Sequence, residues 1–492
     1  MLRLSEVLYG VQPRSSRQLP HLPPHWQGVR LNETVTDSRE IEPDGLFVAL
    51  TGERADGHDF LAEVSTRGAR GALVTRAAVE ARREALSATA RPWVLVDPAS
   101  GAGLAEAPPD ACLFITVDDP LMAVQRLAFY HRSQLAPTMI GITGSVGKTS
   151  TKELTAAVLA RRYRTLKSKR SFNSEATLPT TLLRLTPEHQ VAVLELGMWA
   201  PGEIRFLAGI ARPQIGIVTN IGPSHMERLG SFTAITNAKA ELVESLPANG
   251  WCLLNADDPR VAALAARTRA RVFTYGLKPE ADVWADAITS FGLDGIAFAV
   301  HHADEVDSVR LPLVGRHNVY TALAAISAGL VLDLSWPEIV AGLNDPTAQT
   351  RVQVVTLPNG ATIIDDTYNA APLSVLAALD LLADLPGRKV AVLGDMLELG
   401  PAEEPSHRAV GQHAAHLVET LVTVGPRAGW IAEAAVAAGM SPRRVIACAT
   451  NAAAIMALTA RLERGDYVLI KGSRGMAMEQ IVMALRGVEQ ER

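Results

Sequence analysis

Apolar runs of strand length alternate with helix-like segments from about residue 138 onward, and this alternation limits the possible fold more than any other feature. The runs MIGIT, VAVLEL, IGIVTN and WCLLN are separated by stretches such as STKELTAAVLARRY. This pattern predicts βαβ units and a parallel sheet. A second series, TIIDD, KVAVLGD, LVTVG and YVLIKG, follows after about residue 350. We therefore predict two separate α/β domains in this part of the chain.

The first part of the chain carries shorter apolar runs between Gly, Pro and Asp residues, at 46–50, 72–74 and 93–96. They predict a small mixed α/β unit. Residues 97–111 are rich in Ala, Gly and Pro and have no period, which indicates a surface loop. A chain of 492 residues is expected to hold about three domains. We predict an N-terminal domain at 1–118, a central parallel-sheet domain at 119–348 and a C-terminal Rossmann-like domain at 349–492.

Within the central domain, residues 281–310 predict additional antiparallel strands. The segment GRHNVYTALAAISAGLVL, residues 315–332, predicts a helix that returns the chain to the core.

Composition excludes several classes of protein. The 48% hydrophobic and 20% charged residues are typical of a globular chain, and 47 Lys and Arg against 52 Asp and Glu give a net charge of −5. That balance disfavours a nucleic-acid partner. The three distant cysteines, Cys112, Cys252 and Cys448, fit neither a disulfide framework nor a zinc site. Without a signal-peptide pattern or about 18 consecutive apolar residues, we expect a cytoplasmic protein with no membrane insertion.

The segment GITGSVGKTS, residues 141–150, is the most specific motif. It follows an apolar run and precedes a helix-like run, which is the context of a phosphate-binding loop. Its backbone N–H groups and the helix N-terminus favour an anion. Lys148 is placed to neutralise phosphate charge, and Thr149 to hold Mg²⁺. The common motif is G-x-x-x-x-G-K-[ST], but Ile142 stands at its first Gly, so the spacing here is G-x-x-G-x-x-G-K-[ST]. The alternative is a glycine-rich turn that binds no ligand.

Two ligand-type side chains follow neighbouring predicted strands. Glu195 lies near the end of VAVLELG, and His225 lies beyond IGIVTN. Ligand sites of open α/β sheets lie at these carboxyl ends, so both residues are candidate metal ligands. For Glu195 the alternative is an exposed strand end, and for His225 a structural histidine. Lys239 lies on a predicted helix, where a lysine is typical of a solvated surface.

Two further candidates lie around the start of the third predicted domain. Asp365 and Asp366 end the strand TII, and Arg351 lies at the junction between the second and third domains. An exposed strand end and an interdomain salt bridge remain equally compatible with these residues.

Several motifs together resemble the Mur ligases of peptidoglycan synthesis over essentially the whole chain. The phosphate loop has the family's spacing, and the other similar segments are TDSREIEPDGLFVALTGERADGHDF, NIGPSHMERLGSFTAITNAKAEL, GRHNVYTALAA, DDTYNAAPLS, VLGDMLELG and LIKGSRG. DDTYNA and LGDMLELG are similar to the corresponding motifs of the branch that adds D-alanyl-D-alanine to UDP-N-acetylmuramoyl-tripeptide. The third-residue-adding branch typically carries a D-Y-A-H-type motif where this sequence has DDTYNA. A D-N-P-R motif, the family's motif for diaminopimelate, is also absent from this sequence.

The resemblance implies an ATP- and Mg²⁺-dependent ligase that forms an acyl phosphate during cell-wall synthesis, a process tied to cell shape and division. We expect a monomer. A third-residue-adding ligase, a folylpolyglutamate synthase and a P-loop NTPase without ligase activity remain the alternatives. The third peptide residue of the substrate is left open.

The resemblance also implies roles for individual residues. Catalytic roles fall on Lys148, His225, Lys239 and Arg351. The implied nucleotide contacts are Gly141, Thr143, Gly144, Ser145, Val146, Gly147, Lys148, Thr149, Ser150, Asn318, Arg351 and Asp366. The implied metal ligands are Thr149, Glu195, His225 and Lys239. Lys239 aligns with a lysine that is carbamylated in several Mur ligases. The implied substrate contacts are Asp37, Ser38 and Arg39 at the uridine end, Asn173, and Tyr368 and Asn369 near the dipeptide.

Four positions depart from the family's pattern. Thr321 and Ala371 replace common Asn residues, and Ser174 and Thr177 stand where Asn and Gly are usual. We expect these changes to affect substrate contacts rather than the reaction.

Overall fold

The computed structural model describes residues 1–52, 55–348 and 352–487. The predicted nucleotide contact Arg351 lies outside the described residues. The chain divides into two compact units, and each is described by itself. Unit 1 contains residues 1–141, 163–198 and 203–214, and unit 2 contains residues 142–162, 199–202 and 215–492.

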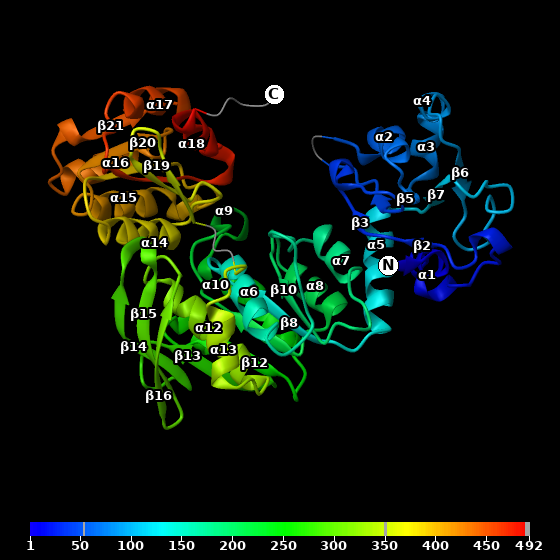
Figure 1. The fold of residues 1–492 in the computed structure, drawn as a ribbon, viewed down its shortest axis with the longest axis horizontal. Coiled ribbons are helices and arrows are strands. Elements are labelled where there is room, and N and C mark those ends of the chain that lie inside the picture. The colour runs from blue at the N-terminus through cyan, green and yellow to red at the C-terminus, as the bar shows by residue number, and fades with distance from the viewer. Residues whose placement is uncertain (53–54, 349–351, 488–492) are drawn as a thin grey trace. The chain divides into compact units, whose positions relative to one another are not determined.

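Unit 1 begins with β1 (Leu2–Arg3), which pairs antiparallel with β2 (Arg30–Leu31), and continues into a five-stranded parallel sheet, drawn in blue in Figure 1. Its strand order is β3-β4-β5-β7-β6, with β3 (Thr34–Val35), β4 (Leu46–Val48), β5 (Gly71–Val74), β6 (Trp93–Val96) and β7 (Cys112–Thr116). Its core includes Val35, Phe47, Val74 and Phe114. The helices of this part are α1 (Leu4–Gly10), α2 (Leu61–Thr66), α3 (Arg76–Ala81), α4 (Arg83–Ser87) and α5 (Pro120–Ser133).

The remainder of unit 1 pairs β9 (Thr165–Lys167) in parallel with β10 (Val191–Glu195). The helices α7 (Thr177–Leu182) and α8 (Glu203–Ala211) follow β9 and β10 in the chain. Strand β8 (Thr138–Thr143) passes from unit 1 into unit 2 and leads into the phosphate loop. The loop therefore begins directly at the end of an apolar strand.

Unit 2 contains β11 (Ile215–Val218), β12 (Trp251–Asn255) and β13 (Arg271–Gly276), which pair in parallel. The next strands, β14 (Val283–Ser290), β15 (Ile296–His302) and β16 (Glu305–Leu311), form an antiparallel extension. The helices here are α6 (Lys148–Leu159), α9 (Met226–Leu229), α10 (Phe232–Ser245), α11 (Pro259–Ala262), α12 (Asn318–Val331) and α13 (Trp336–Leu343).

Helix α6, which starts at the phosphate loop, packs against α12 and α13. The approach of α13 is so close that a Cβ added at Gly342 would lie 2.3 Å from Val158 Cα. Leu154 and Val158 of α6 are buried. This packing holds the helix that carries Lys148 and Thr149.

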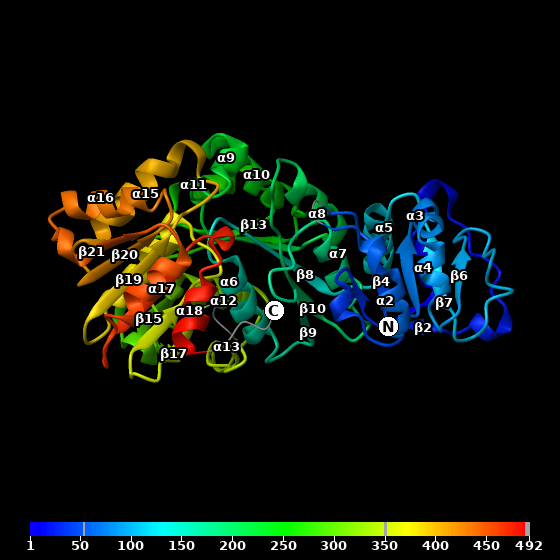
Figure 2. The ribbon, with the colours of Figure 1, turned by 90° about the horizontal axis from the view of Figure 1, so that it is seen from above.

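The last part of unit 2 is a six-stranded sheet of order β17-β18-β22-β19-β20-β21, in which only β17 runs antiparallel to its neighbour. Its strands are β17 (Gln353–Thr356), β18 (Thr362–Asp365), β19 (Lys389–Gly394), β20 (Thr420–Val424), β21 (Val445–Cys448) and β22 (Tyr467–Lys471). Its helices are α14 (Pro372–Ala383), α15 (Glu403–Ala414), α16 (Gly429–Ala437), α17 (Asn451–Thr459) and α18 (Glu479–Arg486). Helices α14 to α16 cover one face and α17 and α18 the other (Figure 2).

The predicted three-part α/β architecture is confirmed. Each predicted strand of the two βαβ series is present, the segment 281–310 contains antiparallel strands, and α12 occupies the predicted helix at 315–332. Residues 97–111 form neither a helix nor a strand. The boundaries at 118 and 348 stay a prediction. Within the described residues, no helix has both the length and the hydropathy needed to span a membrane.

The contact between α6 and α13 generates a stability prediction. Gly342→Ala is expected to lower the free energy of unfolding by about 1–3 kcal/mol, because the added methyl group must push α13 away from α6. Urea unfolding followed by circular dichroism measures the change. Gly209→Ala in α8 is the matched control, since no atom lies within 4 Å of its added Cβ. Equal stability of the Gly342 variant and the control would contradict the tight contact.

Candidate functional site

The phosphate loop follows β8 and ends where α6 begins. Gly144 has a φ of +151° and Gly147, which precedes the helix, has a φ of +86°. Glycine adopts these angles without the steric cost that an L side chain would meet. A Cβ at Gly144 would also lie 1.9 Å from Thr219 Oγ1. The two glycines are therefore required by the backbone path and, at Gly144, by the neighbouring segment.

That neighbouring segment, residues 219–222 after β11, fixes the loop by hydrogen bonds. Ser145 N–H donates to Asn220 O at 2.9 Å. The Asn220 side chain accepts from Val146 N–H and donates to Val146 O, both at 2.9 Å. Thr219 Oγ1 donates to Val146 O at 2.7 Å, and Gly222 N–H donates to Ser145 Oγ at 2.9 Å. These bonds hold the loop in one shape.

Lys148 Nζ donates to the loop's own carbonyls, to Gly144 O at 2.8 Å and to Ser145 O at 3.4 Å. The cation therefore lies over the loop that it was predicted to serve. Thr149 and Ser150 occupy the first turn of α6, and Thr143 ends β8 after Gly141. The structure thus confirms the predicted strand, loop and helix order, with a lysine held at the loop.

Lys239 lies in α10 and is only 2% exposed. The surface position that its helical setting suggested is therefore wrong. Burial, reinforced by the charge of Lys148, lowers the pKa of Lys239 well below the ordinary lysine value. A lysine in this environment favours the neutral amine, which is the form that reacts with CO₂.

His225 has a left-handed backbone, with a φ of +58°, and immediately precedes α9. Its Nδ1 lies 2.7 Å from Glu398 Oε2, and this hydrogen bond lowers the pKa of Glu398. The Trp199 ring lies 6.0 Å from the imidazole, and the Arg228 guanidinium lies 4.1 Å from the Trp199 ring centroid. A partner for His225 had not been predicted.

In unit 1, Glu195 ends β10 and is 1% exposed. The alternative of an exposed strand end is therefore wrong. Asn173 Nδ2 donates to Glu195 Oε1 at 2.8 Å, so a predicted substrate contact and a predicted metal ligand bond each other. A buried carboxylate is costly unless cations or donors compensate it.

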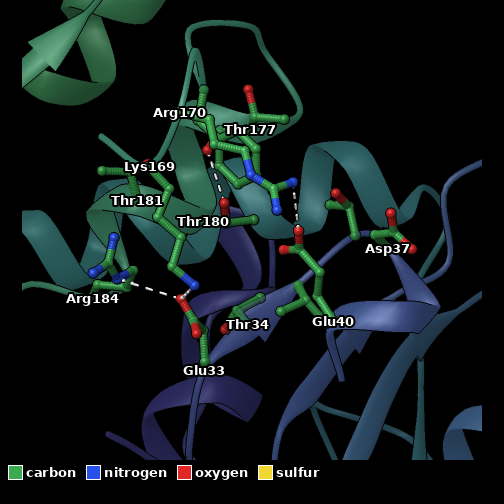
Figure 3. Close-up of a pocket in the computed structure, with 13 residues that line it drawn as sticks. Glu33, Thr34, Asp37, Glu40, Lys169, Arg170, Thr177, Thr180, Thr181 and Arg184 are labelled. Carbon is green, nitrogen blue, oxygen red and sulfur yellow. Dashed lines mark hydrogen bonds and ion pairs between the residues drawn. The ribbon is translucent and has the colours of Figure 1, made fainter. Parts of the chain in front are cut away.

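Unit 1 also contains a cavity of about 170 Å³ next to the predicted uridine end (Figure 3). It is lined by Glu33, Thr34, Val35, Thr36, Asp37, Glu40, Lys169, Arg170, Phe172, Thr177, Thr180, Thr181 and Arg184. This volume is below the roughly 300–1,000 Å³ of typical small-molecule sites, so the cavity suits one part of a larger substrate.

Charges and unpartnered polar atoms line this cavity. Glu33 lies between Lys169, at 2.6 Å, and Arg184, at 3.4 Å. The buried atoms Thr34 Oγ1, Thr181 Oγ1 and Arg184 Nη1 have no hydrogen-bond partner. Buried polar atoms are normally paired, so we expect a polar ligand or a water molecule to contact these atoms.

The other predicted residues near the cavity have mixed positions. Asp37 lines it and bonds Arg39 through two hydrogen bonds of 2.9 and 2.7 Å, whereas the Arg39 side chain is 83% exposed. Ser38 is buried. The substituted positions Ser174 and Thr177 bond each other, with 2.9 Å between their hydroxyl oxygens.

In the C-terminal part, Asp366 forms an ion pair with Lys471 at 2.5 Å, and Lys471 also donates to Asn369 O at 2.9 Å. Tyr368 is 43% exposed. Asn318, at the start of α12, is buried and donates to Val314 O at 2.7 Å. Thr321 is buried on the same helix.

Within residues 1–52, 55–348 and 352–487, no three His, Cys, Asp or Glu side chains form a ready metal cluster. The hydroxyl of Thr149, in the first turn of α6 beside the phosphate loop, is an oxygen donor of the kind that Mg²⁺ prefers. The residues present therefore fit a magnesium–nucleotide complex.

Several structural partners escaped the sequence analysis. Asn220, Glu398, Lys471 and Arg184 each bond a predicted residue or line the cavity. Three of them lie inside segments already identified as family motifs, NIGPSH, LGDMLELG and LIKGSRG, so the motif position was a usable signal. Arg184 had no such signal.

A strand, a fixed glycine loop with its lysine, and a helix define an α/β protein that binds nucleotide phosphates. Matches to three protein-family models identify the class more narrowly. The Mur ligase family catalytic domain matches residues 32–106, the Mur ligase middle domain matches 142–329, and the Mur ligase glutamate ligase domain matches 350–474.

Similar whole proteins carry one activity name. The chain is 33% identical over 467 residues, 94% of each chain, to the UDP-N-acetylmuramoyl-tripeptide--D-alanyl-D-alanine ligase of Bacillus subtilis. It is 38% identical over 474 residues, 91% of each chain, to the ligase of that name from Mycobacterium bovis. A crystal structure of MurF from Acinetobacter baumannii has a TM-score of 0.78 at 30% identity and 99% coverage of both chains. The chain therefore belongs to the Mur ligase family.

Proposed function

We propose that this protein is an ATP-dependent ligase that joins D-alanyl-D-alanine to UDP-N-acetylmuramoyl-tripeptide, as in peptidoglycan precursor synthesis. The observation that carries this proposal is the hydrogen-bonded phosphate loop with Lys148, in a chain whose relatives, matched over more than 90% of their length, bear that activity name. The proposed setting is the cytoplasm, and the proposed enzyme is a monomer without a nucleic-acid partner.

Each of the three predicted domains has a separate role in the proposed enzyme. Residues 1–118 bind the UDP end of the substrate, residues 119–348 bind ATP, and residues 349–492 complete the ligase site. The cavity beside Asp37 supports the first assignment, because the unpartnered Thr34 hydroxyl of this domain can bind an oxygen atom of a nucleotide-linked substrate, together with Thr181 Oγ1 and Arg184 Nη1 of the central domain. Asp37, Ser38 and Arg39 remain the proposed contacts at this end, Asn173 is a further proposed substrate contact, and Tyr368 and Asn369 are the proposed contacts near the dipeptide.

The reaction proceeds in two steps. The terminal carboxylate oxygen of the tripeptide attacks the γ-phosphorus of ATP, forming an acyl phosphate and releasing ADP. The dipeptide amine then attacks the carbonyl carbon, loses a proton, and expels inorganic phosphate through a tetrahedral intermediate. Both steps bring anions together, so the protein's main contribution is positioning and electrostatic stabilisation.

The chain's own residues fit these requirements. The N-terminus of α6 and the loop N–H groups other than those of Ser145 and Val146, which donate to Asn220, bind the phosphates, and Lys148 exchanges its loop carbonyls for phosphate oxygens. Thr149, Glu195, His225 and a carbamylated Lys239 are the proposed Mg²⁺ ligands. When bound, Mg²⁺ neutralises the charge that builds up on the phosphate oxygens. Asn318, Asp366 and Arg351 are the proposed contacts to the rest of the nucleotide, and Arg351 also a proposed catalytic cation.

The first prediction tests the phosphate loop. Lys148→Ala is expected to lower kcat/KM for ligation by about 100- to 1,000-fold or more, because a preorganised cation is lost from the transition state. A coupled assay for ADP measures turnover, and unchanged thermal unfolding shows that the variant is folded. In the unmodified enzyme, ADP release should require both UDP-muramyl-tripeptide and D-alanyl-D-alanine. Release without either substrate would instead identify an NTPase that does not ligate.

The second prediction concerns Lys239. Because burial favours its neutral amine, ¹³C-bicarbonate is expected to give a carbamate NMR signal that Lys239→Ala removes together with activity. Lys278→Ala is the matched control, since Lys278 is exposed. Full activity of Lys239→Ala, or a carbamate signal that survives the substitution, would reject this role.

The third prediction concerns the cavity in unit 1. Arg184→Ala is expected to raise the KM for the UDP-linked substrate by about tenfold or more, because a hydrogen bond from a charged donor contributes roughly 1.5–3 kcal/mol. The KM for ATP should stay unchanged. Arg164→Ala is the matched control, since it removes an exposed ion pair with Glu188. An unchanged KM for the UDP-linked substrate would show that the cavity does not bind it.

A further inference from the structure

Two segments far apart in the sequence of unit 2 meet at His225 and Glu398. The imidazole Nδ1 and the carboxylate Oε2 lie 2.7 Å apart. Both side chains are partly buried, with 28% of His225 and 39% of Glu398 exposed. The contact joins the loop before α9 to the loop after β19.

The backbones at this contact are unusual as well. His225 has a φ of +58° and Glu398 a φ of +66°, in the left-handed region that non-glycine residues seldom occupy. Glu227 N–H donates to Glu398 O at 3.1 Å. A Cβ at Gly400 would lie 2.8 Å from Glu227 Cα, so the two loops are in direct backbone contact. Backbone strain of this kind persists where surrounding structure enforces it, often at functional sites.

The loop that carries Glu398 is anchored by buried polar groups. Asp395 Oδ1 accepts from Ala428 N–H at 2.7 Å, and Asp395 O accepts from Ser473 N–H at 3.0 Å. Leu397 N–H donates to Ser473 Oγ at 2.8 Å, and Met396 N–H donates to His407 Nε2 at 3.0 Å. Asp395, His407 and Ser473 are all at most 4% exposed. Glu398 therefore extends from a rigid platform rather than from a loosely held loop.

The chemistry of the pair follows from its geometry. A carboxylate only accepts hydrogen bonds, so the proton between the two groups belongs to His225 Nδ1. In the neutral imidazole, Nε2 then carries the lone pair and is the atom able to bind a metal ion or accept a proton. Carboxylate partners of this type orient metal-binding histidines and increase their basicity.

We propose that Glu398 is a positioning residue, which fixes His225 in the Nδ1–H tautomer so that Nε2 serves the magnesium–nucleotide complex. This inference rests on the proposed function, because that proposal assigns His225 to the metal ligands. Glu398 belongs to the predicted C-terminal domain and His225 to the predicted central domain. The orientation of the histidine therefore depends on contact between these two segments.

The experiment compares Glu398→Ala, Glu398→Gln and the control Glu227→Ala, which removes an exposed carboxylate beside the same contact. The tautomer is read by ¹⁵N NMR of histidine-labelled protein without nucleotide, with His225→Ala assigning the signals. The unmodified protein and Glu227→Ala should show the Nδ1–H form. Glu398→Gln should retain it, since the amide oxygen still accepts, and Glu398→Ala should lose it.

Metal binding supplies the second readout. Mn²⁺ is titrated by EPR in the presence of a nonhydrolysable ATP analogue. Glu398→Ala should raise the dissociation constant of Mn²⁺ by about 10- to 100-fold, with Glu398→Gln in between and Glu227→Ala unchanged.

An Nε2–H tautomer in the unmodified protein, or an unchanged Mn²⁺ affinity in Glu398→Ala, would overturn the inference. The tautomer of the unmodified protein is decisive even where Glu398→Ala does not fold. Failure of the proposed function has a different signature, namely ADP release without a requirement for both substrates.

Discussion

The hydrogen bonds between the phosphate loop and residues 219–222 are the interaction on which the proposed chemistry depends. A loop of glycines has many accessible conformations, and binding a triphosphate with a mobile loop would lose much of its affinity to ordering. Here Asn220 binds the peptide groups of Val146 from both sides, and Thr219 occupies the space that a side chain at position 144 would need. The ordering cost is therefore met during folding. Helix α6 is in turn held by α12 and α13.

The arrangement of elements was readable from the sequence because it depends on simple periodicity. Apolar runs such as VAVLEL and KVAVLGD gave β10 and β19, and the glycine spacing located the loop before α6. The order of strands in the N-terminal sheet was not readable, since short runs of three to five residues carry no information about their neighbours. Tertiary packing decides that order.

The same distinction between local sequence pattern and tertiary packing applies to the site residues. Lys148 was predictable because its role follows from its place in a local motif. Lys239 was misjudged on pattern alone, because a helical position does not reveal whether three-dimensional packing covers it; only the family resemblance singled it out. Glu398 and Arg184 contact partners distant in the sequence, His225 and Glu33 respectively. Such pairings arise from the fold and leave no periodic or spacing signal in one sequence.

The position of Glu33 between Lys169 and Arg184 has a consequence for selectivity. The Glu33 carboxylate already forms ion pairs with Lys169 and Arg184, so an incoming anion must compete with it for these two cations. A small free anion offers little beyond the charge that Glu33 already provides, so it gains almost nothing by displacing it. A larger molecule that also reaches the unpartnered hydroxyls of Thr34 and Thr181 gains contacts that the carboxylate does not make. In the proposed enzyme, the cavity therefore favours a large substrate with several contacts over a small inorganic anion.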